Sequence, residues 1–191
     1  MARTPKKYLL ASLIEHESCV SLKSTKCWSP TSRLKSSREE GAGLLQLTRA
    51  YNADGSLRFD TIKELKYKHP FSLKDLTWSN VYTRPDLQIR AGVLMMKANY
   101  RYFYSITRDE YNSLAFADAA YNGGIGGVDR ERRACNIATR CDPNIWFDNV
   151  ERFCMKSKVA LYGNRSACDI NRYHVKDVLV IRAPKYINFL K

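Results

Sequence analysis

The sequence predicts a mainly α fold, with a small loop or β region, in a single domain that spans residues 1–191. Apolar residues recur at three- and four-residue spacing in several separate segments, which is typical of amphipathic helices. The composition is 45% hydrophobic, and no repeat, low-complexity segment or Ser/Gly/Pro-rich linker divides the chain. Between about Cys19 and Phe59, however, Ser, Pro, Gly and charged residues favour loops or a small irregular β element, with a turn at 52–56.

The first expected helix, residues 5–18, carries a carboxylate on its apolar face. Its apolar residues lie one helical turn apart at Leu9, Leu10, Leu13 and Ile14. Glu17 follows Leu13 by four residues and so continues the buried stripe, whereas Glu15 is expected to point elsewhere. A carboxylate on an apolar face needs a partner or a function.

Helical patterns then account for most of the chain. They cover 59–67, 73–80, Pro85 to about Tyr104, Asp109 to Tyr121, Asp129 to about Ala138, 143–153 and Ile170 to about Leu190. The segment from Pro85 is expected to be the central core helix, because its apolar residues are Leu87, Ala91, Leu94, Met95, Ala98 and Tyr102. Pro85 suits a first helical turn, and Asp109 and Asp169 suit N-caps. Pro184 is expected to kink or divide the last helix.

The net charge of +13, from 32 Lys and Arg against 19 Asp and Glu, attracts anions such as nucleic acid, anionic membrane or acidic wall polymer. The basic residues are scattered and form no recognised nucleic-acid-binding motif, so no nucleic-acid partner is expected. No apolar run is long enough to span a membrane, and the start of the chain has no signal-peptide cleavage site. We therefore interpret the charge as a solvated cationic surface that favours encounter with an acidic substrate.

Six cysteines fall into three locally spaced candidate pairs: Cys19 with Cys27, Cys135 with Cys141, and Cys154 with Cys168. Disulfides formed in an oxidising compartment and reduced cytosolic thiols both remain open. No metal site is expected, because the chain lacks a C-x-x-C pair and its three histidines are widely separated. No cofactor is expected either.

Three short segments carry the chemistry: Glu17-Ser18, Gly43-Leu44-Leu45-Gln46 and Ala120-Tyr121-Asn122-Gly123-Gly124. Glycosidic cleavage needs a carboxylic acid that stays protonated near neutral pH, and burial against apolar groups raises the pKa of a glutamic acid. Glycines at 41 and 43 let the backbone approach a neighbour, while Leu44 and Leu45 are expected in the core and the Gln46 amide in a groove.

In this order and spacing the segments resemble the soluble lytic transglycosylases that share a fold with goose-type lysozyme. The family has Glu-Ser at the end of the first helix of its catalytic domain, then Gly-Leu-Met-Gln, then Ala-Tyr-Asn-Gly. Here Leu45 replaces the methionine, a change of similar volume. The resemblance spans nearly the whole chain and implies a lysozyme-like catalytic domain.

The resemblance implies a mechanism with one carboxyl group. Glu17 would protonate the glycosidic oxygen between N-acetylmuramic acid and N-acetylglucosamine, and the substrate acetamido group would stabilise the cationic carbon. Glu17 would then take the proton of the muramic 6-hydroxyl as a 1,6-anhydro ring closes. Ser18 would orient Glu17 or the acetamido group, Tyr121 would hydrogen-bond near the acid, and Gln46 and Asn122 would hold the sugar.

The family's C-terminal Arg-x-Tyr-Val segment also contributes a tyrosine to the site. This chain reads Asn171-Arg172-Tyr173-His174-Val175, so alignment on the valine places His174 at the tyrosine position and Tyr173 one residue earlier. Tyr173 is retained as a candidate substrate-binding residue, although a helix turns about 100° per residue and Tyr173 would need a shift in register to reach the site.

Two alternatives stay open. A hydrolytic goose-type lysozyme would need a second carboxylate to position water, for which Glu39 and Glu40 are candidates. A non-enzymatic basic module that binds the wall or nucleic acid is the other. The expected partner is the peptidoglycan glycan strand, and the expected state is a monomer. A phage endolysin would move from host cytoplasm to periplasm and cell wall. A virion-associated wall-degrading enzyme, or a bacterial conjugation or secretion enzyme, would share these features.

Overall fold

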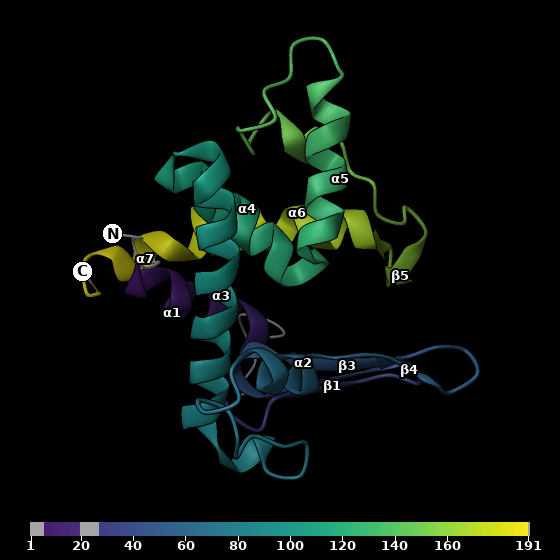
Figure 1. The fold of residues 1–191 in the computed structure, drawn as a ribbon, viewed down its shortest axis with the longest axis vertical. Helices are drawn as coiled ribbons and strands as arrows, with labels where there is room; N and C mark the ends of the chain where they lie inside the picture. The colour runs from purple at the N-terminus through teal and green to yellow at the C-terminus, as the bar shows by residue number, and fades with distance from the viewer. Residues whose placement is uncertain (1–5, 20–26, 191) are drawn as a thin grey trace. The chain divides into compact units, whose positions relative to one another are not determined.

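The computed structural model describes residues 6–19 and 27–190, which are mainly helical with a small antiparallel sheet (Figure 1). The mainly α class is therefore confirmed. The chain forms two compact units, one comprising Leu10–Met95 and the other the described residues before and after it. The single-domain expectation for 1–191 stays a prediction.

The unit Leu10–Met95 contains most of α1 (Lys7–Ser18) and a four-stranded antiparallel sheet in the order β1-β2-β3-β4. The strands are Arg33–Lys35, Glu39–Ala42, Leu47–Tyr51 and Leu57–Asp60. The expected turn at 52–56 closes the last hairpin, where Asn52 N donates to Ser56 O at 2.8 Å and Gly55 has φ +83°. The expected small β element is thus a four-stranded meander, with a register shift between Ala50 and Tyr51.

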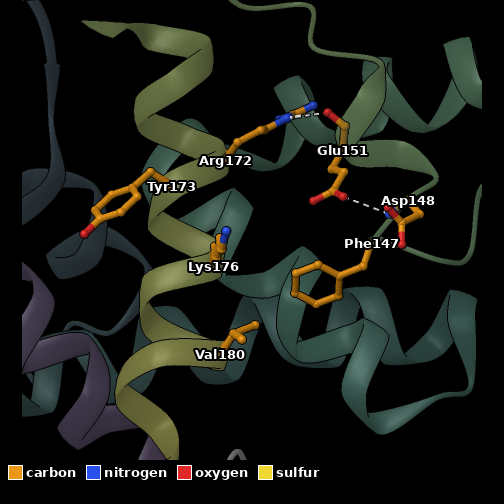
Figure 2. Close-up of a pocket in the computed structure, with 7 residues that line it drawn as sticks. All are labelled: Phe147, Asp148, Glu151, Arg172, Tyr173, Lys176 and Val180. Carbon is orange, nitrogen blue, oxygen red and sulfur yellow. Dashed lines mark hydrogen bonds between the residues drawn. The ribbon is translucent and has the colours of Figure 1, made fainter.

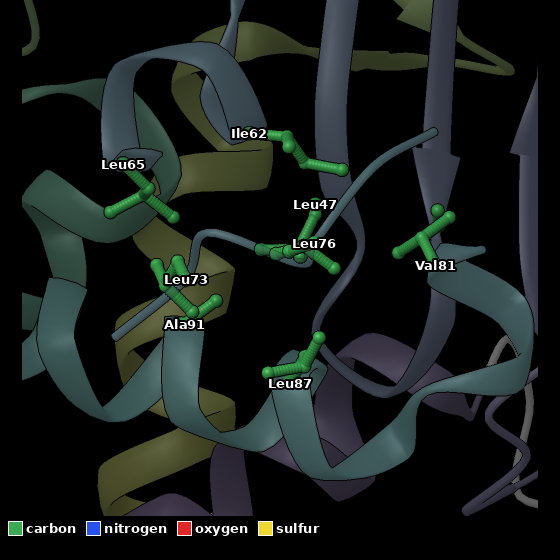
Figure 3. Close-up of a cluster of buried hydrophobic side chains, with 9 residues drawn as sticks. Leu47, Ile62, Leu65, Leu73, Leu76, Val81, Leu87 and Ala91 are labelled. Atoms are coloured by element: carbon green, nitrogen blue, oxygen red, sulfur yellow. The ribbon is translucent and has the colours of Figure 1, made fainter. Parts of the chain in front are cut away.

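An apolar cluster holds this sheet to α2 (Thr61–Lys68) and to the start of α3 (Pro85–Thr107) (Figure 3). Its members are Ala42, Leu47, Ile62, Leu65, Leu73, Leu76, Val81, Leu87 and Ala91. The α2 N-cap is Asp60, whose carboxylate accepts Lys63 N, and Pro85 begins α3 as expected. Burial of these aliphatic side chains is the main stabilising term of this unit.

The expected helix at 73–80 is wrong, since that segment forms turns followed by a short 3-10 helix, η2 (Val81–Thr83). Leu73 and Leu76 are buried at helical spacing, but side chains compete for the backbone. Asn80 Oδ1 accepts Thr77 N at 2.9 Å, and Asn80 Nδ2 donates to Asp75 O at 2.7 Å. Such local hydrogen bonds offer the chain an alternative to the helix.

The second unit contains α4 (Glu110–Gly123), α5 (Ile125–Asn136), α6 (Ala167–Lys176) and the remainder of α3 (Figure 1). In this unit α4 packs against both α5 and α6. Its core is aromatic: Phe116 stacks on Phe103 at 5.4 Å and meets Trp146 edge-on at 5.5 Å. These edge and offset contacts add to the area that the rings bury. The expected face of the long helix is partly wrong, because Ala98 and Tyr102 are exposed.

Several helix boundaries of this unit differ from expectation, and α5 begins at Ile125, four residues before the expected Asp129. Asp109 caps α4 as predicted, but Ser166 rather than Asp169 caps α6, with Asp169 as the reciprocal member of a capping box. The segment 143–153 forms turns and the short 3-10 helix η3 (Val150–Arg152), because Asp148 has φ +59° and cannot continue a helix. A hairpin of β5 (Ala160–Tyr162) and β6 (Arg165–Ser166) precedes α6.

The C-terminal segment is helical but not uniform. After α6 come a π-helical stretch, η4 (Asp177–Arg182), and α7 (Ala183–Ile187). Pro184 lies in the first turn of α7, where a missing N–H is tolerated, and the division falls before it. The six cysteines pair as the three local candidates, Cys19–Cys27, Cys135–Cys141 and Cys154–Cys168.

Candidate functional site

Glu17 lies in the last turn of α1, half-buried, and Ser18 ends the helix fully buried. The expectation that Glu15 leaves the buried face is wrong, because Glu15 is 9% exposed. Burial here runs through every position from Ala11 to Glu15, so a one-sided stripe does not describe α1. Glu17 is therefore the more accessible of the two carboxylates.

Ser18 fixes the end of this helix. Its hydroxyl donates to Ile14 O at 2.6 Å and accepts Trp28 N at 2.8 Å. The one hydroxyl proton is thus used within the fold, and the side chain ties α1 to the segment that carries Trp28. Because Ser18 is fully buried, it can position Glu17 through the backbone, and its hydroxyl does not face solvent.

The segment Gly43–Gln46 is a tight 3-10 turn, η1 (Gly43–Leu45), between β2 and β3. Gly43 has φ +76° and Gln46 has φ +44°, so the backbone enters the left-handed region at both ends of the turn. Leu44 and Leu45 are buried as predicted. Leu45 packs directly on Gly92 of α3, and a Cβ on Gly92 would overlap the leucine side chain. The glycine at 43 meets a conformational requirement.

Gln88 of α3 holds this turn and was not identified from the sequence. The side chain is fully buried; its Oε1 accepts Leu44 N at 2.8 Å, and its Nε2 donates to Pro30 O at 2.9 Å and to Val81 O. A Cβ on Gly43 would overlap the Gln88 amide, so close packing also requires glycine there. A separation of 44 residues hides this clamp from any local pattern.

Gln46 turns its amide toward the loop rather than fully outward. Nε2 donates to Gly43 O at 2.9 Å and lies 3.4 Å from both oxygens of Ser32. Oε1 is buried and has no hydrogen-bond partner among the described residues. It packs so close to Gly41 that a Cβ on that residue would stand 2.5 Å from Oε1. A buried amide oxygen without a donor is uncommon, and it leaves Gln46 with an unused acceptor.

The two carboxylates weighed for hydrolysis are both engaged. Glu40 is 7% exposed, and it accepts hydrogen bonds from Arg33 at 2.6 Å and from Arg49 at 2.6 and 3.0 Å. Burial alone would raise the pKa of Glu40, but the hydrogen bonds from Arg49 and Arg33 outweigh it and lower that pKa. Glu39 forms an ion pair with Arg58 at 3.1 Å. Glu40 is therefore a poor base for activating water.

Tyr121 and Asn122 occupy the last turn of α4, whose preceding residues from Ser113 to Ala120 are all buried. Asn122 is exposed, and its Oδ1 accepts Asn171 Nδ2 at 2.9 Å; the same Nδ2 donates to Ala119 O at 2.9 Å. Because Asn171 occupies its oxygen, Asn122 keeps Nδ2 as a donor that has no acceptor within residues 6–19 and 27–190. Gly124, with φ +78°, ends the helix.

His174, rather than Tyr173, lies against Tyr121. The imidazole is 1% exposed, stacks on the Tyr121 ring at 6.2 Å between centroids, and meets Asp118 Oδ2 at 2.7 Å through Nδ1. The other Asp118 oxygen is buried without a hydrogen-bond partner in the described part of the chain. Tyr173 is 43% exposed and contacts Arg165 and Asp177. A substrate contact by Tyr173 stays a prediction.

A buried ionic cluster, also missed from the sequence, supports the turn after Asn122. Glu131 of α5 is fully buried and accepts Arg172 Nη1 at 2.8 Å and Lys156 Nζ at 3.1 Å. Burial lowers the pKa of Lys156 despite the nearby Glu131 carboxylate. A Cβ on Gly123 would overlap Lys156, so the glycine allows the lysine chain to pass beneath the turn.

The structure groups the predicted residues into two sets. Glu17, Ser18 and Gln46 belong to the unit Leu10–Met95, and the other three, Tyr121, Asn122 and Tyr173, belong to the second unit. Within residues 6–19 and 27–190, no group of three His, Cys, Asp or Glu side chains is placed to hold a metal ion. Nor does any helix of that part of the chain combine the length and apolar content needed to cross a bilayer.

No protein-family profile, curated protein or solved structure matches this chain.

Proposed function

We propose that this protein is a peptidoglycan lytic transglycosylase with a lysozyme-like catalytic fold. One observation carries the proposal: the three segments of the resemblance, in family order, each fall at a helix end or tight turn. A mainly α chain with a small antiparallel sheet is consistent with that fold class. The setting we propose is a phage endolysin or a virion-associated wall-degrading enzyme, with the net charge of +13 favouring contact with the acidic wall.

In the proposed reaction Glu17 is the acid and then the base. It protonates the glycosidic oxygen, the acetamido oxygen of N-acetylmuramic acid stabilises the cationic carbon, and the Glu17 carboxylate removes the proton of the 6-hydroxyl as the anhydro ring forms. The bond to N-acetylglucosamine breaks, and no water is consumed. A half-buried position at a helix end suits this role, because the acid stays partly desolvated yet reaches the sugar.

The supporting residues have groups left for the sugar. Asn122 is exposed, and its Nδ2 can donate to an acetamido oxygen. Gln46 Oε1 is buried, so the Gln46 side chain would have to turn outward before Oε1 accepts an amide or hydroxyl proton of the sugar. Tyr121 is held from below by the His174 ring, so the aromatic side chain is supported without Tyr173. Preorganised donors and acceptors of this kind stabilise a transition state because they need no rearrangement during the reaction.

Hydrolysis by the same scaffold is the second candidate. Its support is weakened by the two arginines on Glu40, which leave Glu39 as the carboxylate to test. An inert wall-binding module is the third, and the net charge of +13 would serve it equally well.

Mass spectrometry of the products released from purified Gram-negative peptidoglycan distinguishes the three candidate functions. Muropeptides that end in 1,6-anhydro-muramic acid, lighter by one water, are expected from the wild type. Glu17→Gln is expected to abolish release while binding to the wall and thermal stability are retained, and Glu64→Gln, at an exposed site on α2, is the matched control. Reducing-end muramic acid that disappears in Glu39→Gln would replace the proposal with hydrolysis. An unchanged rate in Glu17→Gln would refute Glu17 as the acid.

A further inference from the structure

A pocket of about 440 Å³ lies in the second unit, between α6 with η4 and the loop that precedes η3 (Figure 2). Its lining includes Phe147, Asp148, Glu151, Arg172, Lys176 and Val180. None of these residues belongs to the proposed catalytic set. Tyr173 also borders the pocket, but its ring points away from Glu151 and Asp148 (Figure 2).

Arg172 forms a fixed wall of this pocket. Its Nε donates to Glu151 O at 2.7 Å, its Nη1 to Glu131 at 2.8 Å, and its guanidinium lies over the Trp146 ring at 4.9 Å. Arg172 is thus paired with the buried Glu131, a carboxylate that it shares with Lys156, and its donors are used within the fold. Arg172 shapes the pocket and does not supply its open charge.

The open charges are one cation and two carboxylates. Lys176 is exposed on α6, and it has no ion pair in the part of the chain that the structure describes. On the facing loop, Glu151 Oε1 accepts Asp148 N at 2.8 Å, which holds Asp148 in its left-handed conformation with its own carboxylate exposed (Figure 2). Phe147 and Val180 supply the apolar walls.

This arrangement fits a zwitterion on a short alkyl chain. A carboxylate would pair with Lys176, an ammonium with Asp148 and Glu151, and the chain would lie against Phe147. Two carboxylates disfavour a phosphate or nucleotide, because like charges repel. Within peptidoglycan, the group with a free ammonium and carboxylate on one carbon is the side-chain end of the diaminopimelyl residue in the stem peptide.

We propose that this pocket binds the stem peptide of peptidoglycan through the zwitterionic end of its diamino acid. The proposal rests on the wall polymer being the substrate, as proposed above, and adds a peptide contact that is separate from the glycan site. It predicts that the enzyme prefers glycan strands that carry diaminopimelate peptides over bare strands.

Calorimetric titration of the full chain with the tripeptide L-Ala-γ-D-Glu-diaminopimelate tests the pocket directly. Lys176→Gln is expected to weaken binding about tenfold, the loss of one charge-assisted hydrogen bond. The tripeptide with lysine in place of diaminopimelate lacks the side-chain carboxylate, and it is expected to bind the wild type about tenfold more weakly than the diaminopimelate tripeptide does. The Lys176→Gln substitution is expected to leave the affinity for the lysine tripeptide unchanged. Lys158→Gln, at another exposed lysine of this unit, is the control.

Charge-only variants test the opposite wall without disturbing it. Glu151→Gln keeps the acceptor for Asp148 N, and Asp148→Asn keeps a residue that tolerates left-handed backbone. Together they are expected to weaken tripeptide binding at least tenfold. If the protein cleaves intact wall but does not bind the tripeptide, or binds it equally well without Lys176, the proposed peptide pocket is refuted and the proposed function stands. Lys176-dependent binding without any cleavage would support the pocket and refute the enzyme.

Discussion

Replacement of Gln88 by leucine tests whether a buried amide holds the Gly43–Gln46 turn. Leucine has a similar volume, so the change removes hydrogen bonds and leaves little cavity. It would strip Leu44 N of its acceptor and Pro30 O and Val81 O of their donor, all around a side chain that is fully buried. The turn would keep its glycine but lose the contact that fixes it to α3.

The magnitude follows from those three groups. A buried N–H left without a partner costs about 1–3 kcal/mol, and the two carbonyls add less because each has a second lone pair. Burial of the apolar leucine returns part of this, so the free energy of unfolding is expected to fall by about 3 kcal/mol. Val93→Ala, at an exposed position of the same helix, is expected to change it by less than about 0.5 kcal/mol.

Urea titration with disulfides intact, followed by tryptophan fluorescence, measures the difference. Trp28 and Trp78 report on the unit that contains Gln88, Trp146 reports on the other unit, and far-UV circular dichroism reports on the whole chain. Coincident transitions by the two probes are needed before a free energy is assigned. A loss below about 1 kcal/mol in Gln88→Leu would refute the reasoning, because it would mean that water or a rearranged turn satisfies Leu44 N equally well.

Three further predictions concern other contacts. Because the folded-state pKa of Glu40 is lowered from 4.5, its stabilising contribution is full above that value and is lost as pH falls through the folded pKa. Glu40→Gln should therefore flatten the acid limb of stability measured by urea titration from pH 6 to 3, and an unchanged slope would contradict this. Gly123→Ala should lower wall-cleaving activity about tenfold, because its Cβ would press on Lys156 and stand 3.0 Å from Asn171 Nδ2, which orients Asn122. Gly126→Ala, with only an arginine nitrogen at 3.9 Å, should retain activity, and equal losses would refute this role of Gly123. Binding to purified wall, measured by sedimentation, should weaken as salt rises, since it depends on the charge of +13; indifference to salt would assign the charge another role.

The parts of the fold that could be predicted are those set by local signals. Asp109 caps α4 and Pro85 opens α3 because a side-chain acceptor and a fixed φ each act within one turn. The failures at 73–80 and 143–153 have local causes too, but they are backbone competitors that an apolar periodicity does not register. The predicted cap of α6, Asp169, lies three residues after the observed cap, Ser166, because both residues belong to one capping box and either resembles a cap in the sequence.

The candidate site divides along the same line. Segments such as Gly43–Gln46 and Ala120–Gly123 are visible in the sequence because glycine and amide residues stand out in a run of apolar ones. The residues that support these segments cannot be recognised from local sequence, because their partners are distant: Gln88 is 44 residues from Leu44, and His174 is 56 residues from Asp118. Nothing in a local window distinguishes those side chains from solvated polar residues.

The holding residues also bear on whether the two turns are functional. Burying an amide or a carboxylate is unfavourable unless each polar atom finds a partner, and an apolar residue would stabilise a merely structural turn at lower cost. Yet the Gln88 side chain forms three hydrogen bonds, one of them to the Gly43–Gln46 turn and two to the segments beside it. Asn171 donates two hydrogen bonds to the end of α4. The result at each place is one fixed conformation, in which Gln46 Oε1 is buried without a donor among the described residues and the exposed Asn122 keeps a donor that faces solvent. Rigid, half-satisfied polar groups suit the recognition of a polar chain such as a glycan. On this reasoning, Asn171→Leu should weaken glycan binding although Asn171 is buried and touches no substrate, and Asn171→Asp, which keeps only the acceptor, should not restore it. Recovery of binding in Asn171→Asp would show that the Asn122 contact is dispensable.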